Sequence, residues 1–177
     1  MDAPSYQLTI RSARDLGEAA QERVEALLRE AFQNDEFGRA FRWADNDWSL
    51  LMEAQGELVS HVGLVERTIT ADGLPVRVGG VSAVATASAW RRRGLARQLV
   101  ERAAGFMRAE LRLDFGLLIC GDDMIPFYDR LGWRVTPGPL WVDQPQGKVR
   151  MPTTIMTLPL AGRPWPGGTI DLCGLPW

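Results

Sequence analysis

The stretch from Gly80 to Val100, GVSAVATASAWRRRGLARQLV, constrains the fold more than any other part of this 177-residue chain. Its first half, residues 81–86, is small, β-branched and uncharged, which is typical of a strand buried on both faces. Apolar residues then recur every three or four positions from Leu95 onwards, the period of an amphipathic helix. The stretch therefore predicts a buried strand that runs through a basic loop into a helix.

The basic loop is suited to holding an anion. The first turn of a helix has four backbone N–H groups without intrahelical partners and a partial positive charge. Gly94 and Ala96 are small enough to let a bulky anion approach this backbone, and three consecutive arginines precede them. The order of strand, glycine and helix favours a phosphate or diphosphate site over a solvated helix start. The loop has neither the Gly-x-Gly-x-x-Gly spacing of a dinucleotide site nor the Gly-Lys-Ser/Thr of a nucleoside triphosphate loop.

The pattern Arg91-x-x-Gly94-x-Ala96 also resembles the Arg/Gln-x-x-Gly-x-Gly/Ala signature of the GNAT family of N-acetyltransferases. In that family the loop holds the pyrophosphate of acetyl-coenzyme A (acetyl-CoA), so the resemblance implies acetyl-CoA as the co-substrate. It also implies that the strand before the loop contacts the acetyl and pantetheine groups. The cofactor-binding residues expected on this basis are Val84, Ala85, Thr86, Arg91, Arg92, Arg93, Gly94, Leu95, Ala96 and Arg97.

Composition argues against several other classes. The chain is long enough to bury a sizeable core, so we expect a single domain over residues 1–177. A formal net charge of −2 argues against a nucleic-acid binder with a broad basic face. Cys120, Cys173 and the single histidine form no metal-ligand pattern, so we expect no metal and a reducing environment. No apolar segment is typical of a signal peptide or a membrane span, so we expect a cytoplasmic protein without membrane contact.

Strand and helix patterns alternate along the rest of the chain. Strands are expected at 6–11, 48–54, 57–70, 76–86, 115–120, 133–135, 140–142 and 154–160. Asp15 and Glu18 resemble a capping box for a first helix, and a short helix is expected over 124–131. The polar and aromatic segment 33–48 is either a short helix or a lid loop. These patterns predict an α+β (mixed α/β) domain, and the GNAT resemblance implies a central mixed sheet with helices on both faces.

Acyl transfer from a thioester to an amine also needs an oxyanion donor and a proton donor for the leaving group. Backbone N–H groups of residues 82–86 would supply the first if this strand separates from the 115–120 strand. Tyr128 is the candidate general acid for the departing thiolate, because a tyrosine keeps its proton to a pH near ~10. The alternative for Tyr128 is an aromatic residue packed against Phe127 and Trp133.

No residue pattern identifies the base that takes a proton from the attacking amine. His61 lies in the middle of an expected strand, where a packed and hydrogen-bonded core position is favoured over a base. A water molecule held by the strand backbone would also serve. The side chains left open are Asp122, Asp123, Asp171, His61 and the terminal carboxylate of Trp177.

Over nearly its whole length the chain looks like the aminoglycoside 2′-N-acetyltransferases. The likeness rests on segments 58–62, 77–81, 91–99 and 115–118, on the stretch from Asp122 to Trp133, and on a tail ending in tryptophan. It implies that Tyr128 is the general acid. Where that family has a strand glutamate, this chain has Ser82, the second catalytic candidate, although serine alone is a poor base at neutral pH. The substrate-binding candidates are Asp35, Glu36, Asp122, Asp123, Asp171 and Trp177.

Ser82 lacks the negative charge of the family's strand glutamate, which favours a less cationic sugar as the acceptor. Kasugamycin is one such compound that enzymes of this type acetylate. The predicted function is therefore acetylation of a primary amine of an aminosugar, such as the 2′-amine of kasugamycin, with loss of antibiotic activity. The segments SHVGLVER and WPGGTID also resemble the rhizobial nodulation N-acyltransferases. Acylation of another aminosugar or small amine, and a non-catalytic CoA-binding sensor, stay open. A homodimer also stays open, because GNAT proteins often dimerise.

Overall fold

The computed structural model describes residues 5–177, so the first four residues of the predicted domain lie outside the described part. Its helices are α1 (Glu18–Ala31), α2 (Glu36–Arg39), α3 (Leu95–Ala109) and α4 (Ile125–Asp129), with short 3₁₀ turns η1 (Ala13–Asp15), η2 (Ser88–Trp90) and η3 (Asp122–Met124). Its strands are β1 (Tyr6–Ser12), β2 (Trp48–Ala54), β3 (Glu57–Ala71), β4 (Leu74–Thr86), β5 (Phe115–Cys120), β6 (Arg134–Val135), β7 (Leu140–Gln144), β8 (Gly147–Met151), β9 (Thr154–Pro159) and β10 (Ile170–Asp171). Within this part no helix is both long and apolar enough to span a membrane.

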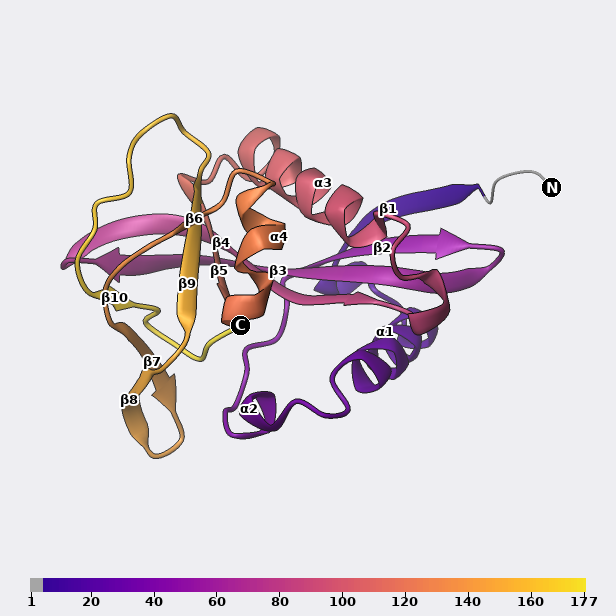
Figure 1. Ribbon diagram of the computed structural model, residues 1–177, viewed down its shortest axis with the longest axis horizontal. Coiled ribbons are helices and arrows are strands. Elements are labelled where there is room, and N and C mark those ends of the chain that lie inside the picture. The colour runs from indigo at the N-terminus through magenta and orange to yellow at the C-terminus, as the bar shows by residue number, and fades with distance from the viewer. Residues whose placement is uncertain (1–4) are drawn as a thin grey trace.

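The strands form one mixed sheet in the order β6-β9-β5-β4-β3-β10-β7-β8, and β2 joins β1 to the first half of β3. The long strands β3 and β4 form an antiparallel hairpin. Asp72 and Gly73 turn the chain between them with φ values of 50° and 78°, the positive values that a two-residue hairpin turn requires. β4 and β5 run parallel, because α3 carries the chain back across the sheet between them (Figure 1).

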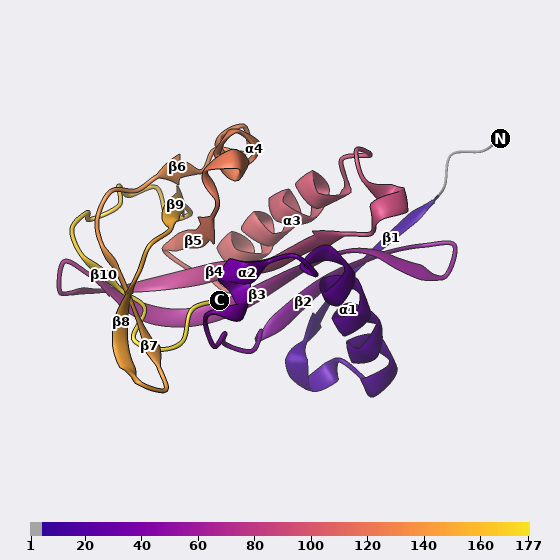
Figure 2. The ribbon, with the colours of Figure 1, turned by 60° about the horizontal axis from the view of Figure 1, so that its bottom comes forward.

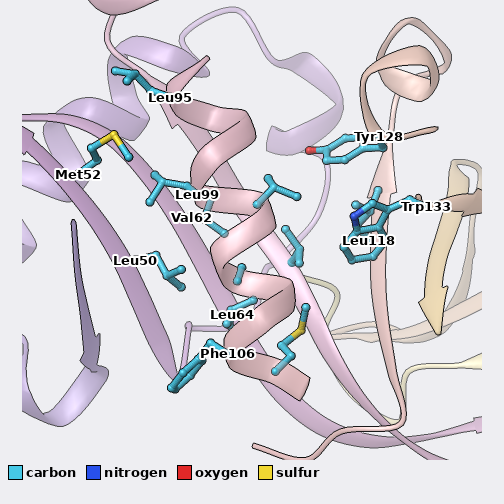
Figure 3. Packing of buried hydrophobic residues seen from close by; sticks show 14 of the residues in the cluster. Leu50, Met52, Val62, Leu64, Leu95, Leu99, Phe106, Leu118, Tyr128 and Trp133 are labelled. Carbon is cyan, nitrogen blue, oxygen red and sulfur yellow. The ribbon is translucent and has the colours of Figure 1, made fainter. Parts of the chain in front are cut away.

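Helices cover both faces of this sheet, as predicted. α3 lies on one face of β3 and β4, and α1 lies on the other (Figure 2). The apolar side of α3, including Leu95 and Leu99, packs on residues of β2 and β3 such as Leu50 and Val62 (Figure 3). A second apolar cluster fills the opposite face towards β7 and includes Phe115 and the terminal Trp177. The mixed α/β fold predicted from the sequence is therefore confirmed.

The sequence pattern was wrong at the start of α1. Glu18 is the first residue of the helix and Gly17 is its N-cap, so Asp15 does not belong to a capping box. Asp15 instead closes the preceding turn, where its backbone N–H donates to Ser12 Oγ at 3.3 Å and its carboxylate accepts from the same hydroxyl at 2.6 Å. The Ser12 hydroxyl, three residues upstream, thus caps this turn and engages the Asp15 carboxylate that the capping box would have needed. Segment 33–48 contains the short helix that was one of the two expected alternatives, α2, followed by a loop.

Candidate active site

β4 and β5 are paired over only part of their length. The pairing runs from Val78–Phe115 to Val81–Leu118. Beyond this point residues 82–86 keep β3 as their partner, while the end of β5 keeps β9. The two strands therefore separate, and in the described part of the chain one edge of 82–86 has no strand beside it. This is the separation on which the expected oxyanion donor depends.

The separated part of β4 contains a β-bulge. Gly63 is opposite Ser82 and His61 is opposite Ala85, so Ala83 and Val84 together stand against a single residue of β3. Ala83 has a φ of 48°, in the left-handed region that residues with a Cβ rarely occupy. The peptide groups at this point are consequently turned out of the regular ladder, where the two strands part.

A cavity of about 740 Å³ lies between the start of α3, the end of α1 and α4. Gly94 caps α3 with a φ of 75° and contributes no side-chain hydrogen bond to the helix. A Cβ at Gly94 would meet nothing within 4 Å, so the backbone is open to a ligand on this side. Since no side chain caps the helix, its first-turn N–H groups face this opening as free donors.

The cavity brings together most of the predicted cofactor-binding residues. Arg91 is held in place by its Nε, which donates to the carbonyl of Thr86 at 3.1 Å. Arg93 is not part of the cavity wall, because its guanidinium lies over the ring of Trp90, 4.7 Å from the centroid. The predicted residues that line the cavity are Val84, Ala85, Thr86, Arg91, Arg92, Gly94, Leu95, Ala96 and Arg97.

Tyr128 lies on α4 beside the separated strands and is only 6% exposed. Its ring packs on Phe127 and Trp133 at centroid distances of 4.9 and 6.3 Å. Its hydroxyl points away from Trp133, towards α3 (Figure 3). Burial, and to a smaller extent the neighbouring Cys120, raises the pKa of Tyr128 well above its usual value. The phenol is therefore packed, as the second alternative from the sequence expected, and it is protonated, while its role as general acid stays a prediction.

Cys120 stands at the end of β5, close to Tyr128. Burial, followed by the carboxylates of Asp122 and Asp123, raises the pKa of the Cys120 thiol to about 11. The thiol is consequently protonated at neutral pH and is a poor nucleophile.

On the face opposite α3, Ser82 is paired with an amide. Its Oγ donates to Oδ1 of Asn46 at 2.5 Å, and the Asn46 side chain packs against Gly63. Gly80 lies on the same face as Ser82, two residues earlier, and the indole of Trp177 covers it. Trp177 is 4% exposed, and its Nε1 donates to the carbonyl of Leu117 at 3.4 Å.

The predicted acidic residues do not form one cluster. Asp35 caps α2 by accepting from the backbone N–H of Gly38 at 2.8 Å, and Glu36 begins that helix. Asp122 accepts from Thr154 Oγ1 at 2.5 Å, and Asp123 follows it in η3, which leads into α4. Residues 5–177 contain no grouping of His, Cys, Asp and Glu that would hold a metal ion.

Asp171 lies away from the other candidates. It is opposite Thr70 near the far end of β3, whereas Ser82 is opposite Gly63. Its carboxylate forms an ion pair with Lys148 at 2.5 Å. The structure therefore does not bring Asp171 together with Ser82 and Tyr128.

Sequence reasoning missed two parts of the site. Asn46 reaches Ser82 from a loop 36 positions earlier, and no local pattern indicated that contact. The cavity wall also contains two exposed apolar side chains, Phe32 and Met124, with exposures of 42% and 37%. Phe32 is the C-cap of α1, and helical periodicity does not tell a core contact from a cavity wall.

Comparisons with known proteins agree with this geometry. Residues 12–136 match the family described as acetyltransferase (GNAT) domain. The fold is similar to that of an N-acetyltransferase from Lactobacillus plantarum (TM-score 0.64, 22% identity, 88% of this chain and 99% of the other). It is also similar to the Escherichia coli GNAT protein YhbS in complex with CoA (TM-score 0.63, 18% identity, 97% and 93% covered).

A third similar structure is a GNAT acetyltransferase from Brucella melitensis in complex with acetyl-CoA (TM-score 0.62, 16% identity, 93% and 94% covered). At such identities the structural likenesses establish the fold alone. The family match covers more than half of the sequence, including the strand, the basic loop and the helix from which the prediction started. The chain therefore belongs to the GNAT acetyltransferase family.

Proposed function

We propose that this chain transfers the acetyl group of acetyl-CoA to a primary amine of an aminosugar, such as the 2′-amine of a kasugamycin-like aminoglycoside. As a GNAT acetyltransferase it is an acetyl-CoA-dependent N-acetyltransferase, so the proposal concerns the acceptor and the residues that act on it. The observation that carries it is one cavity that joins the N-terminus (the mouth) of α3 to the open edge of β4.

The groups at the mouth of α3 fit the diphosphate of acetyl-CoA. The free N–H groups after Gly94 and the side chains of Arg91 and Arg92 provide the donors and positive charge that a diphosphate requires. When bound, acetyl-CoA supplies an activated acetyl thioester. The CoA and acetyl-CoA complexes of the E. coli and Brucella proteins support the same use of this fold.

The open edge of β4 and Tyr128 then account for the chemistry. Val84 lines the cavity within the bulge, and its backbone N–H is the candidate donor to the carbonyl oxygen on which negative charge develops. Tyr128, whose hydroxyl is kept protonated by burial, is the candidate donor of a proton to the departing sulfur. Val84 lines the cavity itself, whereas Tyr128 packs on Phe127, which lines it.

The acceptor side is polar but neutral around Ser82. The Ser82 hydroxyl is bonded to the amide of Asn46, and neither group can act as a base near pH 7. An acceptor amine must therefore lose its proton to water or to another group. Asp122, Asp123 and the terminal carboxylate of Trp177 are the candidates for that group, and Asp35 and Glu36 on α2 are candidate sugar contacts. The neutral pair supports a sugar with few positive charges.

The test is a thiol-release assay with acetyl-CoA against an aminosugar panel of kasugamycin, gentamicin and tobramycin, followed by mapping of the acetylated nitrogen. We expect turnover with kasugamycin to exceed turnover with the other two. Equal rates, or none, would contradict the proposed acceptor. Tyr128→Phe keeps the ring and its packing and serves as the matched variant. It should lose turnover while keeping the affinity for CoA, whereas unchanged turnover would remove Tyr128 from the mechanism.

A second candidate is transfer of a longer acyl chain. The observation in its favour is the pair of exposed apolar side chains, Phe32 and Met124, at the cavity wall, where a fatty acyl group would find apolar contacts. A series of acyl-CoA donors from two to twelve carbons separates the two functions. A turnover rate that is highest with acetyl-CoA supports acetyl transfer, and a rate that rises with acyl chain length supports transfer of a longer chain. Binding of CoA without turnover of any acceptor would instead indicate a sensor.

A further inference from the structure

Three buried polar side chains lie beneath the bulge of β4. Ser60 and His61 of β3 are 0% exposed, and Ser49 of β2 is 4% exposed. Ser60 Oγ donates to the carbonyl of Ala85 at 2.8 Å. The His61 ring has Nδ1 at 2.9 Å from the carbonyl of Ala83 and Nε2 at 3.1 Å from Ser49 Oγ. Burying polar groups is costly unless each finds a partner, and here two of the partners are carbonyls of the bulge.

The chemistry of these partners fixes the tautomer of His61. The Ala83 carbonyl can only accept, so Nδ1 must carry a hydrogen and donate. Burial lowers the pKa of His61, which favours the neutral ring. In the neutral ring Nε2 is then an acceptor, and Ser49 Oγ is its donor. His61 is therefore a fixed neutral donor to one backbone carbonyl, and the Ser49 hydroxyl satisfies its other ring nitrogen.

That carbonyl belongs to a residue whose backbone is strained. Ala83 has a φ of 48°, a conformation of a kind that typically costs about 1–3 kcal/mol and persists only when its surroundings hold it. The carbonyl of Ala83 and the N–H of Val84 share one trans peptide plane and point in opposite directions. A bond from His61 to the carbonyl consequently directs the Val84 N–H away from the His61 ring. Val84, in turn, lines the cavity.

We propose that His61 is a positioning residue for acetyl transfer: its Nδ1–H holds the Ala83 carbonyl and thereby aims the Val84 N–H at the thioester carbonyl. The inference rests on the proposed function, because it assumes that the thioester lies along β4. Removing one oxyanion donor typically lowers kcat by about 100- to 1000-fold. Loss of the His61 hydrogen bond frees the peptide plane but keeps the Val84 N–H, so it should lower kcat by less, roughly 10- to 100-fold. The affinity for acetyl-CoA should change little.

The first test is spectroscopic and needs no substrate. His61 is the only histidine of the chain, so ¹⁵N-histidine labelling gives the signals of this one ring. We expect ¹⁵N chemical shifts typical of a protonated, pyrrole-type Nδ1 and an unprotonated, pyridine-type Nε2. These shifts should not change across the pH range in which the protein is folded and the ring is neutral. An Nε2–H tautomer, or a ring that averages between the two, would overturn the inference.

The second test compares three substitutions. In His61→Asn the side-chain NH₂ occupies the place of Nδ1 and can still donate to Ala83. In His61→Gln it occupies the place of Nε2, and His61→Leu has no donor. Thr157→Val is the matched control, because it removes a buried hydrogen bond of 2.7 Å to Thr136 from β9, which β5 separates from β4. All four variants are compared at equal concentrations of folded protein.

The readouts are the affinity for [1-¹³C]acetyl-CoA and the ¹³C shift of its bound carbonyl, which moves downfield when the oxygen accepts a hydrogen bond. We expect a downfield shift in the wild-type protein, in His61→Asn and in Thr157→Val, and its loss in His61→Gln and His61→Leu, at similar affinities. A shift that is the same in all variants would overturn the inference while leaving the proposed function intact. Failure of the wild-type protein to bind acetyl-CoA would overturn the proposed function and this inference with it.

Discussion

The contact between Gly80 and Trp177 gives the sharpest prediction for stability. A Cβ at Gly80 would lie closer than 3.0 Å to three atoms of the indole ring, a separation that real Cβ atoms do not show. The ring is held in place, because Arg67 lies over it at 5.1 Å from the centroid and also donates to the carbonyl of Leu175 at 2.7 Å. Gly80→Ala therefore has to displace either the indole or the strand.

The magnitude follows from this geometry. Overpacking of a filled site costs about 1–3 kcal/mol, so Gly80→Ala should lower the free energy of unfolding by that amount. Trp177→Ala should cost about 3–5 kcal/mol, as for other buried tryptophans. Without the indole, alanine at position 80 meets no obstacle, and the strand preference for alanine over glycine makes it neutral or stabilising by about 0.5–1 kcal/mol. The two substitutions should thus be coupled by about 1–4 kcal/mol.

Urea unfolding of the wild-type protein, both single variants and the double variant measures this coupling directly. Effects of independent sites add within about 0.3–0.5 kcal/mol, so the expected coupling is well outside that range. Affinity for acetyl-CoA should not change in Gly80→Ala, because the cavity lies at the mouth of α3. Additive effects of the two substitutions would refute the packing of Trp177 on Gly80.

Three further predictions concern the site. Arg91→Ala and Arg92→Ala should each weaken CoA binding about tenfold in a calorimetric titration. Arg93→Ala should change the affinity by less than about threefold, because the Arg93 guanidinium lies over Trp90. Equal effects of the three substitutions would contradict the cavity assignment. Ser82 and Asn46 are neutral and the pKa of Tyr128 is raised, so log kcat/KM should rise with pH to the pKa of the acceptor amine and then stay level. A decrease of kcat/KM that begins below pH ~10 would argue against Tyr128 as the acid. Ellman's reagent should react rapidly with the exposed Cys173 and slowly with Cys120, whose thiol has a pKa of about 11, and Cys120→Ser should remove only the slow phase; two fast thiols would contradict the buried environment of Cys120.

Local patterns predicted the parts of the fold that depend on local physics. The strand, basic loop and helix from Val81 to Leu99 were readable because small residues, glycine and a helical period each have a direct structural meaning. The Asp72-Gly73 turn was predictable for the same reason. The short strands β8 and β10 were not predicted. β10 has only two residues and forms between β3 and β7, which are distant in sequence, whereas β8 pairs with the preceding β7 through a turn for which no signal was recognised.

The site shows the same division. The cavity at the mouth of α3 follows from one continuous motif, and its lining contains most of the residues expected there. Asn46 beside Ser82 and Trp177 over Gly80 depend on chain crossings that no single segment encodes. The strained φ of Ala83 was equally invisible, because alanine has no preference for that conformation and the bulge is imposed by pairing with β3.

The parting of β4 from β5 also affects how the protein behaves without ligand. An unaccompanied strand edge exposes backbone amides and carbonyls that can recruit another chain, and natural proteins generally shield such edges. An extended amide-containing arm lying along residues 82–86 would act as a surrogate strand and close this edge. The empty protein should therefore be the form more prone to self-association and lower in melting temperature, and purification in the presence of CoA should yield the better-behaved sample.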